Sequence, residues 1–274
     1  DIDRGRANAN SLIGSLLLEI HKSTANGIRL SSLKGGTRMN VIPVKAEAKI
    51  GFDASDEAMI LKTVQECEKE LKRKFEKSDP ELKITCERGR KGSKGKDLFL
   101  SVDDTKRALR LIASLPDGVR KMSKSLPDLV ETSSNFARLE LDKDKISFDI
   151  SIRSSIDEEK KSLKDEIAEI VKSEGGSSFE GDRYPGWPHN PNSKITEIAT
   201  KVYAKMTGDE PRLEAIHAGL ECGLFQDKIE GLDCVSFGPT MTGVHSPEER
   251  LSISSTRRTY ELLTRILKEL CREG

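Results

Sequence analysis

Apolar residues recur at helical spacing along the first two thirds of the chain. Leu12, Leu16 and Ile20 fall on one face of a 3.6-residue period, as Ile60 and Val64 do further along. An apolar stripe of this width predicts an amphipathic helix that packs against a core. The spacing predicts four such helices, over 10–22, after residue 57, over 104–113 and after residue 158.

Two stretches of the chain carry the same order of signals. In 36–71 and again in 133–171, an asparagine is followed by strand-like alternation, an Asp-Glu turn and an amphipathic helix. Each stretch follows a predicted helix, and the first is followed by a candidate strand over 82–87. The duplicated order of helix, strand, strand, helix, strand predicts an α+β unit in which helices cover one face of a single sheet. Two copies predict a sheet of about eight strands.

The last third of the chain has a different pattern. The segment 175–193 contains three prolines and the only tryptophan, and it is interpreted as a linker or crossover. Beyond it, short apolar runs alternate with helical patterns, which is typical of a parallel or mixed α/β sheet. The predicted order is a helix over 193–206, a strand over 212–216, a short helix over 220–225, a strand over 233–237 and a helix over 256–271. Because so few strands would leave unpaired edges, we expect half of this domain to be missing.

Composition excludes several classes of partner. Lysine plus arginine and aspartate plus glutamate number 46 each, so no net charge attracts nucleic acid or an anionic membrane surface. No apolar run approaches the roughly 18 residues of a membrane span. The five cysteines are an odd set without a C-x-x-C pair, which fits reduced thiols in the cytoplasm better than a disulfide framework. The chain starts without methionine or a signal peptide, so we expect a processed or engineered piece.

Two histidines are candidates for site chemistry. His217 and His245 each stand among glycines and small residues at the end of a short apolar run, where a side chain can face a cleft. His245 could bind zinc through its neutral imidazole, His217 could contact a substrate, and Glu221 could receive a substrate amine. The alternative for His217 and Glu221 is a hydrogen-bonded structural histidine and a glutamate favoured by a helix N-terminus. His21 and His189 are predicted to be surface residues.

Three further polar residues lie beside the predicted strands. Asn40 and Asn135 stand near the start of the two duplicated strand patterns, and Asn40 precedes an extended run, where an asparagine most often forms a turn. Arg153 ends a predicted strand over 146–152, and its planar guanidinium could bind a carboxylate through two hydrogen bonds. The alternative for Arg153 is a solvated arginine at the edge of the sheet.

Several motifs resemble those of the Xaa-His dipeptidase (aminoacyl-histidine dipeptidase) family of di-zinc exopeptidases. The most specific are IHAGLECGLF at 216–225 and VSFGPTMTGVHSPEERL at 235–251. RGRANANSL, GGTRMNVIP, SIRSSIDEE and RYPGW extend the resemblance over essentially the whole chain. The resemblance implies a lid domain over 1–183, built of two repeats over about 1–97 and 98–183. It implies that 184–274 is the C-terminal part of a zinc-exopeptidase α/β catalytic domain.

The resemblance also implies a reaction. In this family two divalent metals, usually zinc, share a water that a glutamate deprotonates for attack on a peptide carbonyl. His245 matches a metal ligand of the family. Asn135 and Arg153 match lid residues that hold the carbonyl or carboxylate of the substrate, and Asn40 belongs to the same motif in the first repeat.

The remaining metal ligands and the catalytic glutamate of the family have no counterparts in this sequence, so no catalytic residue is assigned within it. We expect these groups in a missing N-terminal catalytic segment, and we expect this chain alone to be inactive. The implied partners are a dipeptide substrate, the missing segment and, as an open question, a second copy in a homodimer. The alternative function is a non-catalytic fragment that acts as a peptide-binding or assembly module.

Overall fold

The computed structural model describes residues 2–89, 98–123, 129–143, 145–181, 185–214, 221–244 and 248–273. The chain divides into two compact units, Asp1–Asp182 and Arg183–Gly274, and each unit has a hydrophobic core of its own. None of the helices in the described ranges is long and apolar enough to cross a lipid bilayer.

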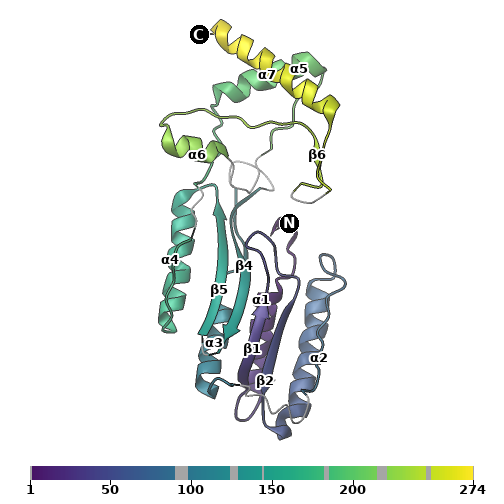
Figure 1. Cartoon of the computed structure of the whole chain (residues 1–274), viewed down its shortest axis with the longest axis vertical. Helices are drawn as coiled ribbons and strands as arrows, with labels where there is room; N and C mark the ends of the chain where they lie inside the picture. Colours follow the sequence, from purple (N-terminus) through teal and green to yellow (C-terminus); the bar gives the residue numbers. More distant parts are fainter. Residues whose placement is uncertain are drawn as a thin grey trace. The chain divides into compact units, whose positions relative to one another are not determined.

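The first unit is a sheet with helices packed on one face (Figure 1). Its order confirms the predicted mixed α/β class and the repeated helix-strand-strand-helix pattern, with one extra strand before the second strand pair. The helices are α1 (Ala9–Ser23), α2 (Glu57–Lys74), α3 (Val102–Ser114) and α4 (Asp157–Ser173), with 3-10 turns at Ile2–Arg4 and Ala54–Asp56. The strands are β1 (Arg29–Gly35), β2 (Ala46–Gly51), β3 (Gly118–Met122), β4 (Val130–Asp142) and β5 (Lys145–Ser154).

The described residues of this unit form one antiparallel sheet of five strands, with β4 at its centre. β5 pairs with β4 along 132–142, whereas β1 pairs with β4 only through Lys34 and Gly35. β3 pairs with the first part of β4, over 130–134. β5 pairs along one edge of β4, past the residues that pair with β1 and most of those that pair with β3. β1 and β3 therefore lie one after the other along the opposite edge of β4. β2 lies beyond β1.

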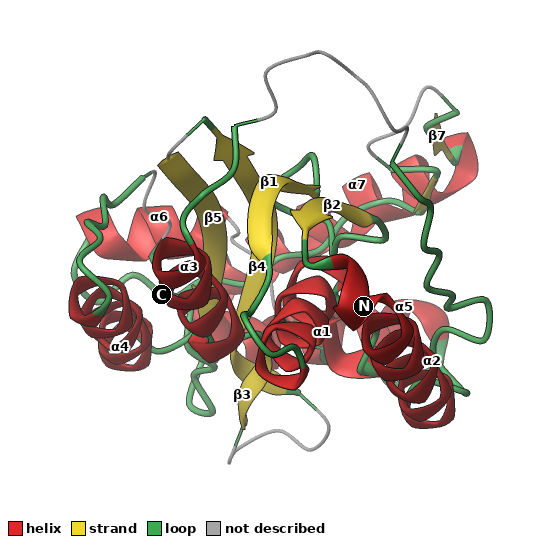
Figure 2. Ribbon diagram, turned by 90° about the horizontal axis from the view of Figure 1, so that it is seen from below, coloured by secondary structure: helices red, strands yellow, loops and turns green. Residues whose placement is uncertain are grey.

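The helices lie in a row against the sheet, in the order α4, α3, α1, α2 (Figure 2). Between the two layers, Phe136 and Leu139 of β4, Leu33 of β1 and Ile112 of α3 are no more than 1% exposed. The ring of Phe136 meets that of Phe148 from β5 edge-on, with 5.9 Å between the ring centroids. Burial of these side chains is the main term that holds helices and sheet together.

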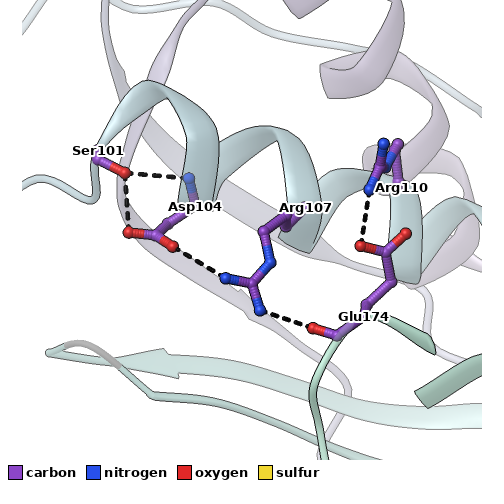
Figure 3. Close-up of polar contacts among 5 residues, drawn as sticks. All are labelled: Ser101, Asp104, Arg107, Arg110 and Glu174. Carbon is purple, nitrogen blue, oxygen red and sulfur yellow. Dashed lines mark hydrogen bonds and ion pairs between the residues drawn. The ribbon is translucent and has the colours of Figure 1, made fainter. Parts of the chain in front are cut away.

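Polar contacts fix α3 at its start and along its side (Figure 3). Ser101 is the N-cap, and its Oγ accepts a hydrogen bond from the Asp104 backbone N–H at 3.0 Å, which satisfies one of the free amides of the first turn. Arg107 donates to the Glu174 backbone oxygen at 2.7 Å, and Arg110 to the Glu174 carboxylate at 2.8 Å. Glu174 is the C-cap of α4, so these contacts join the two helices of the second repeat.

Two features of the predicted sheet are wrong. The described sheet has five strands rather than about eight, and residues 82–87 form no strand. The backbone N–H of Ile84 donates instead to Glu68 of α2 at 3.3 Å, so this segment lies along a helix. The contact with β1 is made by Leu100, whose backbone N–H donates to the Leu30 carbonyl at 2.8 Å.

The second unit is built on two packed helices. Ile198 of α5 (Lys194–Thr207) packs with Leu262 and Ile266 of α7 (Ile253–Glu273). Ser193 caps α5 by accepting from the Thr196 N–H at 3.1 Å. The unit also contains α6 (Glu221–Lys228), β6 (Met241–Thr242) and β7 (Arg250–Leu251). All three helices confirm the helices predicted for this part of the chain.

The strands predicted at 212–216 and 233–237 are wrong in their described parts, 212–214 and 233–237, which carry no strand ladder. The described ladder of this unit is β6 with β7. Asp233 turns its carboxylate to the start of α5, where Oδ2 accepts from the Ile195 N–H at 3.1 Å. Burial opposes ionisation, but hydrogen bonds from this helix end hold the pKa of Asp233 below its usual value. The segment therefore packs at the start of α5. A buried strand needs neighbouring strands to satisfy its backbone hydrogen bonds, and 233–237 has none among the described residues.

Candidate functional site

The open face of the β4–β5 pair brings two of the predicted site residues together. Asn135 of β4 pairs with Ser151 of β5. Two residues further along the ladder, Ser133 of β4 pairs with Arg153 of β5. The neighbouring pair of Phe136 and Ile150 contributes to the helix-covered core, and successive side chains of a strand point to opposite faces. Asn135 and Arg153 therefore lie on the face of the sheet that the helices do not cover. They are diagonal neighbours on adjacent strands, for which the usual spacing between residues is about 7–8 Å.

Asn135 binds the loop that contains Asn40. Its side-chain amide donates to the Met39 carbonyl at 3.2 Å and to the Val41 carbonyl at 3.0 Å. Asn40 lies between these two carbonyls in sequence and is exposed. The first strand pair and the second thus contribute to one polar region, which contains the Asn40 loop, Asn135 and half-buried Arg153. A surface of this kind offers amide groups and a guanidinium to a peptide or a carboxylate.

A buried polar network supports Asn135 from below. Asn8 is 5% exposed, and its side-chain amide donates to the Asp117 carboxylate at 2.8 Å and to the side-chain oxygen Oδ1 of Asn135 at 3.3 Å. The same Asp117 oxygen accepts from the Phe136 backbone N–H at 2.9 Å. Asn10 is fully buried and donates to the Phe136 carbonyl at 3.0 Å. The network holds the backbone of β4 in place next to Asn135, because these buried polar groups would lose their hydrogen bonds if the strand moved.

Sequence reasoning missed the roles of Asn8, Asn10 and Asp117. The available signal was the position of Asn8 two residues before a predicted helix, since asparagine is a preferred N-cap residue. In the structure Asn8 is the N-cap of α1, and its Oδ1 accepts from the Asn10 N–H at 3.0 Å. The contacts of Asn8 with Asp117 and Asn135 join residues more than a hundred positions apart in the sequence, and no local pattern predicts them.

Gly36 allows the loop to leave β1 close to β4. The register of β4 shifts between Phe136 and Arg138, which marks a bulge at Ala137. Gly36 has φ +70°, and a Cβ atom at this position would lie 1.8 Å from the Ala137 carbonyl oxygen. Only glycine accommodates both the backbone angle and this approach. Further along the loop, the Pro43 carbonyl accepts from the Ala9 N–H at 2.9 Å, so the loop is held at both ends.

The remaining predicted site residues belong to the second unit. His217 and His245 lie outside the described residues, within 215–220 and 245–247. Glu221 is described: it is the first residue of α6 and is exposed. Within the ranges that the structure describes, no three side chains of histidine, cysteine, aspartate or glutamate are grouped so that they could hold a metal ion.

His21 is a structural residue, and its predicted place on the surface is wrong. The side chain is 8% exposed, because α1 ends here and the following turn folds back over the ring. Nδ1 accepts from the Ile28 N–H at 3.2 Å, and the ring packs on Gly27. Burial lowers the pKa of His21, which keeps the imidazole neutral. His189 is exposed, as predicted.

Three comparisons with known proteins each match the chain to peptidases. Residues 31–269 match peptidase family M20/M25/M40. The chain is 32% identical over 276 residues to a cytosol non-specific dipeptidase of Escherichia coli (strain K12), over 98% of this chain and 54% of that protein. The crystal structure of aminoacylhistidine dipeptidase from Vibrio alginolyticus superposes with a TM-score of 0.85 at 28% identity, over 97% of this chain and 53% of the other.

These matches confirm the resemblance read from the motifs. The chain spans about half the length of the relatives that it matches. The similarity therefore does not by itself assign the activity of those proteins to this chain. The family match covers most of the chain, and the likeness in sequence and in structure extends over nearly all of it. The chain is a member of peptidase family M20/M25/M40.

Proposed function

We propose that this chain is the lid domain and the C-terminal catalytic part of a metal-dependent dipeptidase that hydrolyses Xaa-His dipeptides in the cytoplasm. The observation that carries the proposal is the polar region on the open face of the first unit. There the 39–41 loop of the motif GGTRMNVIP is bonded to Asn135, which in turn pairs with Ser151, the first residue of the motif SIRSSIDEE. The names of the two relatives, a cytosol non-specific dipeptidase and an aminoacylhistidine dipeptidase, support the same activity.

In this proposal the lid residues recognise the ends of the dipeptide. Arg153 binds the substrate carboxylate through its two parallel N–H groups. Asn40 offers its amide to the substrate carbonyl, and Asn135 acts through the loop that it holds, because its own amide hydrogens are engaged there. From the second unit, His217 contacts the substrate and Glu221 receives the substrate amine. A bidentate carboxylate contact would make the site specific for short peptides with a free C-terminus.

The hydrolytic step needs groups besides those of the lid. We propose His245 as one ligand of a site for two zinc ions, and the bound metal would supply an activated water as the nucleophile. The other ligands and the general base belong, in this proposal, to an N-terminal catalytic segment that corresponds to the unmatched part of the relatives. A homodimer is a further proposed state of the complete enzyme.

A non-catalytic assembly or peptide-binding module is the second candidate function. Tyr260, Leu263 and Leu267 are exposed at helical spacing on α7, while Leu262 and Ile266 of the same helix are buried against α5. A helix with a second apolar face packs against another surface more readily than it stays in water. This face favours an assembly role for the chain by itself.

Zinc titration and a peptidase assay on the purified chain separate the two functions. We expect weak zinc binding by calorimetry and no hydrolysis of Ala-His, because one histidine ligand does not hold a catalytic ion. Addition of the N-terminal catalytic segment, expressed as a separate chain, should produce zinc-dependent hydrolysis. Hydrolysis by the chain alone would show that the metal site lies elsewhere. Failure of the two chains together, with a stable complex present, would favour the assembly module.

A further inference from the structure

A small cavity lies at the end of the first unit where β1 begins and β2 ends. Its volume is about 210 Å³, and it is lined by the turn before β1, by Arg29, by the end of β2 with the two residues that follow, and by Phe99. Such a volume holds far more than one water molecule but falls below the range of about 300–1,000 Å³ that drug-sized ligands occupy. The cavity therefore suits a ligand of the size of a single amino acid.

The cavity is separate from the polar region around Asn135. Arg29 is the first residue of β1, whereas the loop that binds Asn135 leaves the strand after Gly35, its last residue. Strand residues rise about 3.3 Å each, so the two ends of β1 lie about 20 Å apart. An amino acid in the cavity therefore does not reach the Asn40 loop.

Two phenylalanine rings form the apolar part of the lining. The backbone N–H of Leu100 donates to the Leu30 carbonyl at 2.8 Å, which holds the segment of Phe99 beside β1. A Cβ atom at Gly51 would lie 2.9 Å from a ring carbon of Phe99, so this ring rests on a strand position that has no side chain. Phe52 is 41% exposed and Phe99 44%, although phenylalanine is among the residues most often buried. Exposed rings that line one cavity favour a ligand that brings an aromatic ring of its own.

The cavity also holds a cation and an anion that are not paired with each other. Arg29 lies opposite Gly51 in the β1–β2 ladder, and its neighbour Leu30 is fully buried in the core, so Arg29 belongs to the open face of the sheet. Asp53 accepts from the Asn26 side-chain amide through Oδ2 at 2.7 Å, which leaves Oδ1 for another donor. Within the described ranges, neither Arg29 nor Asp53 takes part in an ion pair.

We propose that this cavity binds a free aromatic α-amino acid. The guanidinium of Arg29 receives the α-carboxylate through two N–H groups, and the carboxylate of Asp53 accepts from the α-ammonium group. The ring of the ligand lies against Phe52 and Phe99 in offset or edge-on contact. A zwitterion suits the cavity because it brings both charges that the two unpaired side chains need. A ligand with about a dozen non-hydrogen atoms should bind with a dissociation constant on the order of 1 mM.

Four ligands separate these contacts on the full chain. L-Phenylalanine is titrated into ¹⁵N-labelled protein, and the backbone amide NMR signals of Asn26, Gly27 and Gly51 report on the cavity. Of the other three ligands, 3-phenylpropionate lacks the ammonium group, phenethylamine lacks the carboxylate and L-alanine lacks the ring. We expect each of these to bind about tenfold more weakly than L-phenylalanine, because each loses one of the three contacts.

Two substitutions assign the charged contacts to their residues. Arg29→Gln should weaken L-phenylalanine about tenfold, to the level of phenethylamine, and should leave phenethylamine itself unchanged. Asp53→Asn should weaken L-phenylalanine to the level of 3-phenylpropionate and leave that ligand unchanged, while its amide oxygen still accepts from Asn26. Arg73→Gln, at an exposed arginine of α2, is the charge-matched control and should bind all four ligands as wild type does.

Circular dichroism of each variant checks that the fold persists, and the ligand series on the wild-type chain tests the site without any substitution. The proposal is overturned if L-phenylalanine at about 20 mM, well above the expected dissociation constant, shifts none of the three amides. It is also overturned if the shifts centre on residues 39–41, or if 3-phenylpropionate or phenethylamine binds as tightly as L-phenylalanine.

Discussion

Single side chains in this protein gain their roles from partners that are distant in sequence. Asn135 was expected to hold a substrate, and its side-chain amide is bonded to the backbone of the 39–41 loop. Its side-chain oxygen accepts from the side-chain amide of Asn8, near the start of the chain. A residue of this kind affects binding through the position of a neighbouring segment. Arg153, on the same face of the sheet, is the better candidate for direct contact with a charged ligand.

Arg153→Lys should weaken binding of a dipeptide with a free carboxylate by about tenfold, because a lysine keeps the charge but loses the two-bond contact. The same variant should bind Ala-His amide, which lacks the carboxylate, as well as wild type does. Dissociation constants from NMR titration of the four combinations provide the measurement. Arg138→Lys, on the same face of β4, is the matched control and should change neither constant. An equal loss for acid and amide would remove Arg153 from the carboxylate site.

His21 should make the stability of the protein depend on pH. Because burial lowers the pKa of the folded state below the ordinary value of 6.5, the unfolded chain binds a proton first as the pH falls. Stability is therefore complete above about pH 6.5 and declines below it until the folded-state pKa is reached. Thermal unfolding at pH 7.5, 6.5 and 5.5 gives the profile.

His21→Asn is expected to flatten this profile, since an amide oxygen can accept from the Ile28 N–H without titrating. The exposed His189 offers the matched control, and His189→Asn should retain the wild-type profile. If wild type and His21→Asn lose stability in parallel between pH 6.5 and 5.5, the titrating group is a different one.

Helices and strands were predictable here to the extent that their apolar residues follow one period. The stripes that include Leu16 and Ile20, and Ile60 and Val64, predicted α1 and α2 because these residues meet the core beneath the sheet. The segments 82–87 and 233–237 also resembled strands, yet the backbone of Ile84 bonds to α2 and the side chain of Asp233 bonds to α5. Local alternation says that a segment is extended, while its partner is decided by the rest of the fold.

The candidate site was predictable in a similar, partial way. The motifs singled out Asn40, Asn135 and Arg153, and the predicted duplication put Asn40 and Asn135 in equivalent places, but neither indicated that Asn135 would bind the Asn40 loop. The bulge at Ala137, in the β4–β5 pairing, and the close approach of Gly36, where β1 meets β4 across the two repeats, together position that loop. A pairing of this range is not encoded in any short window of the sequence.

Removal of the N-cap of α3 should reduce stability by about 1 kcal/mol. Ser101→Ala takes away the oxygen that accepts from the Asp104 N–H, and leaves a helix-end amide without a protein partner. Urea unfolding followed by circular dichroism measures the change. Ser147→Ala, an exposed position on β5, is the control and should stay within about 0.5 kcal/mol of wild type. Equal stability of the Ser101→Ala variant would mean that the Arg107 and Arg110 contacts to Glu174 suffice to hold the helix.

At the scale of the whole chain, the two units differ greatly in the size of their cores. The first core joins residues from all four helices and from the sheet, including Phe136, Leu33 and Ile112. In the described part of the second unit, the buried apolar cluster consists of Ile198, Leu262 and Ile266. Because stability grows with apolar surface removed from water, a core of this size supplies little of it without a partner.

The chain should therefore unfold in two steps, the second unit at the lower temperature. Ile266→Ala removes a buried side chain of the small core and should lower the temperature of the first transition only. Leu33→Ala should lower that of the second transition only. Each substitution should reduce the free energy of unfolding of its own unit by about 2–5 kcal/mol. Calorimetry resolves the transitions, and limited proteolysis at an intermediate temperature should cut α5 and α7 while 1–181 stays intact. A single transition that moves with either substitution would show that the two units unfold as one cooperative body. In that case the small core takes its stability from the large one, and the exposed face of α7 would no longer favour a separate partner.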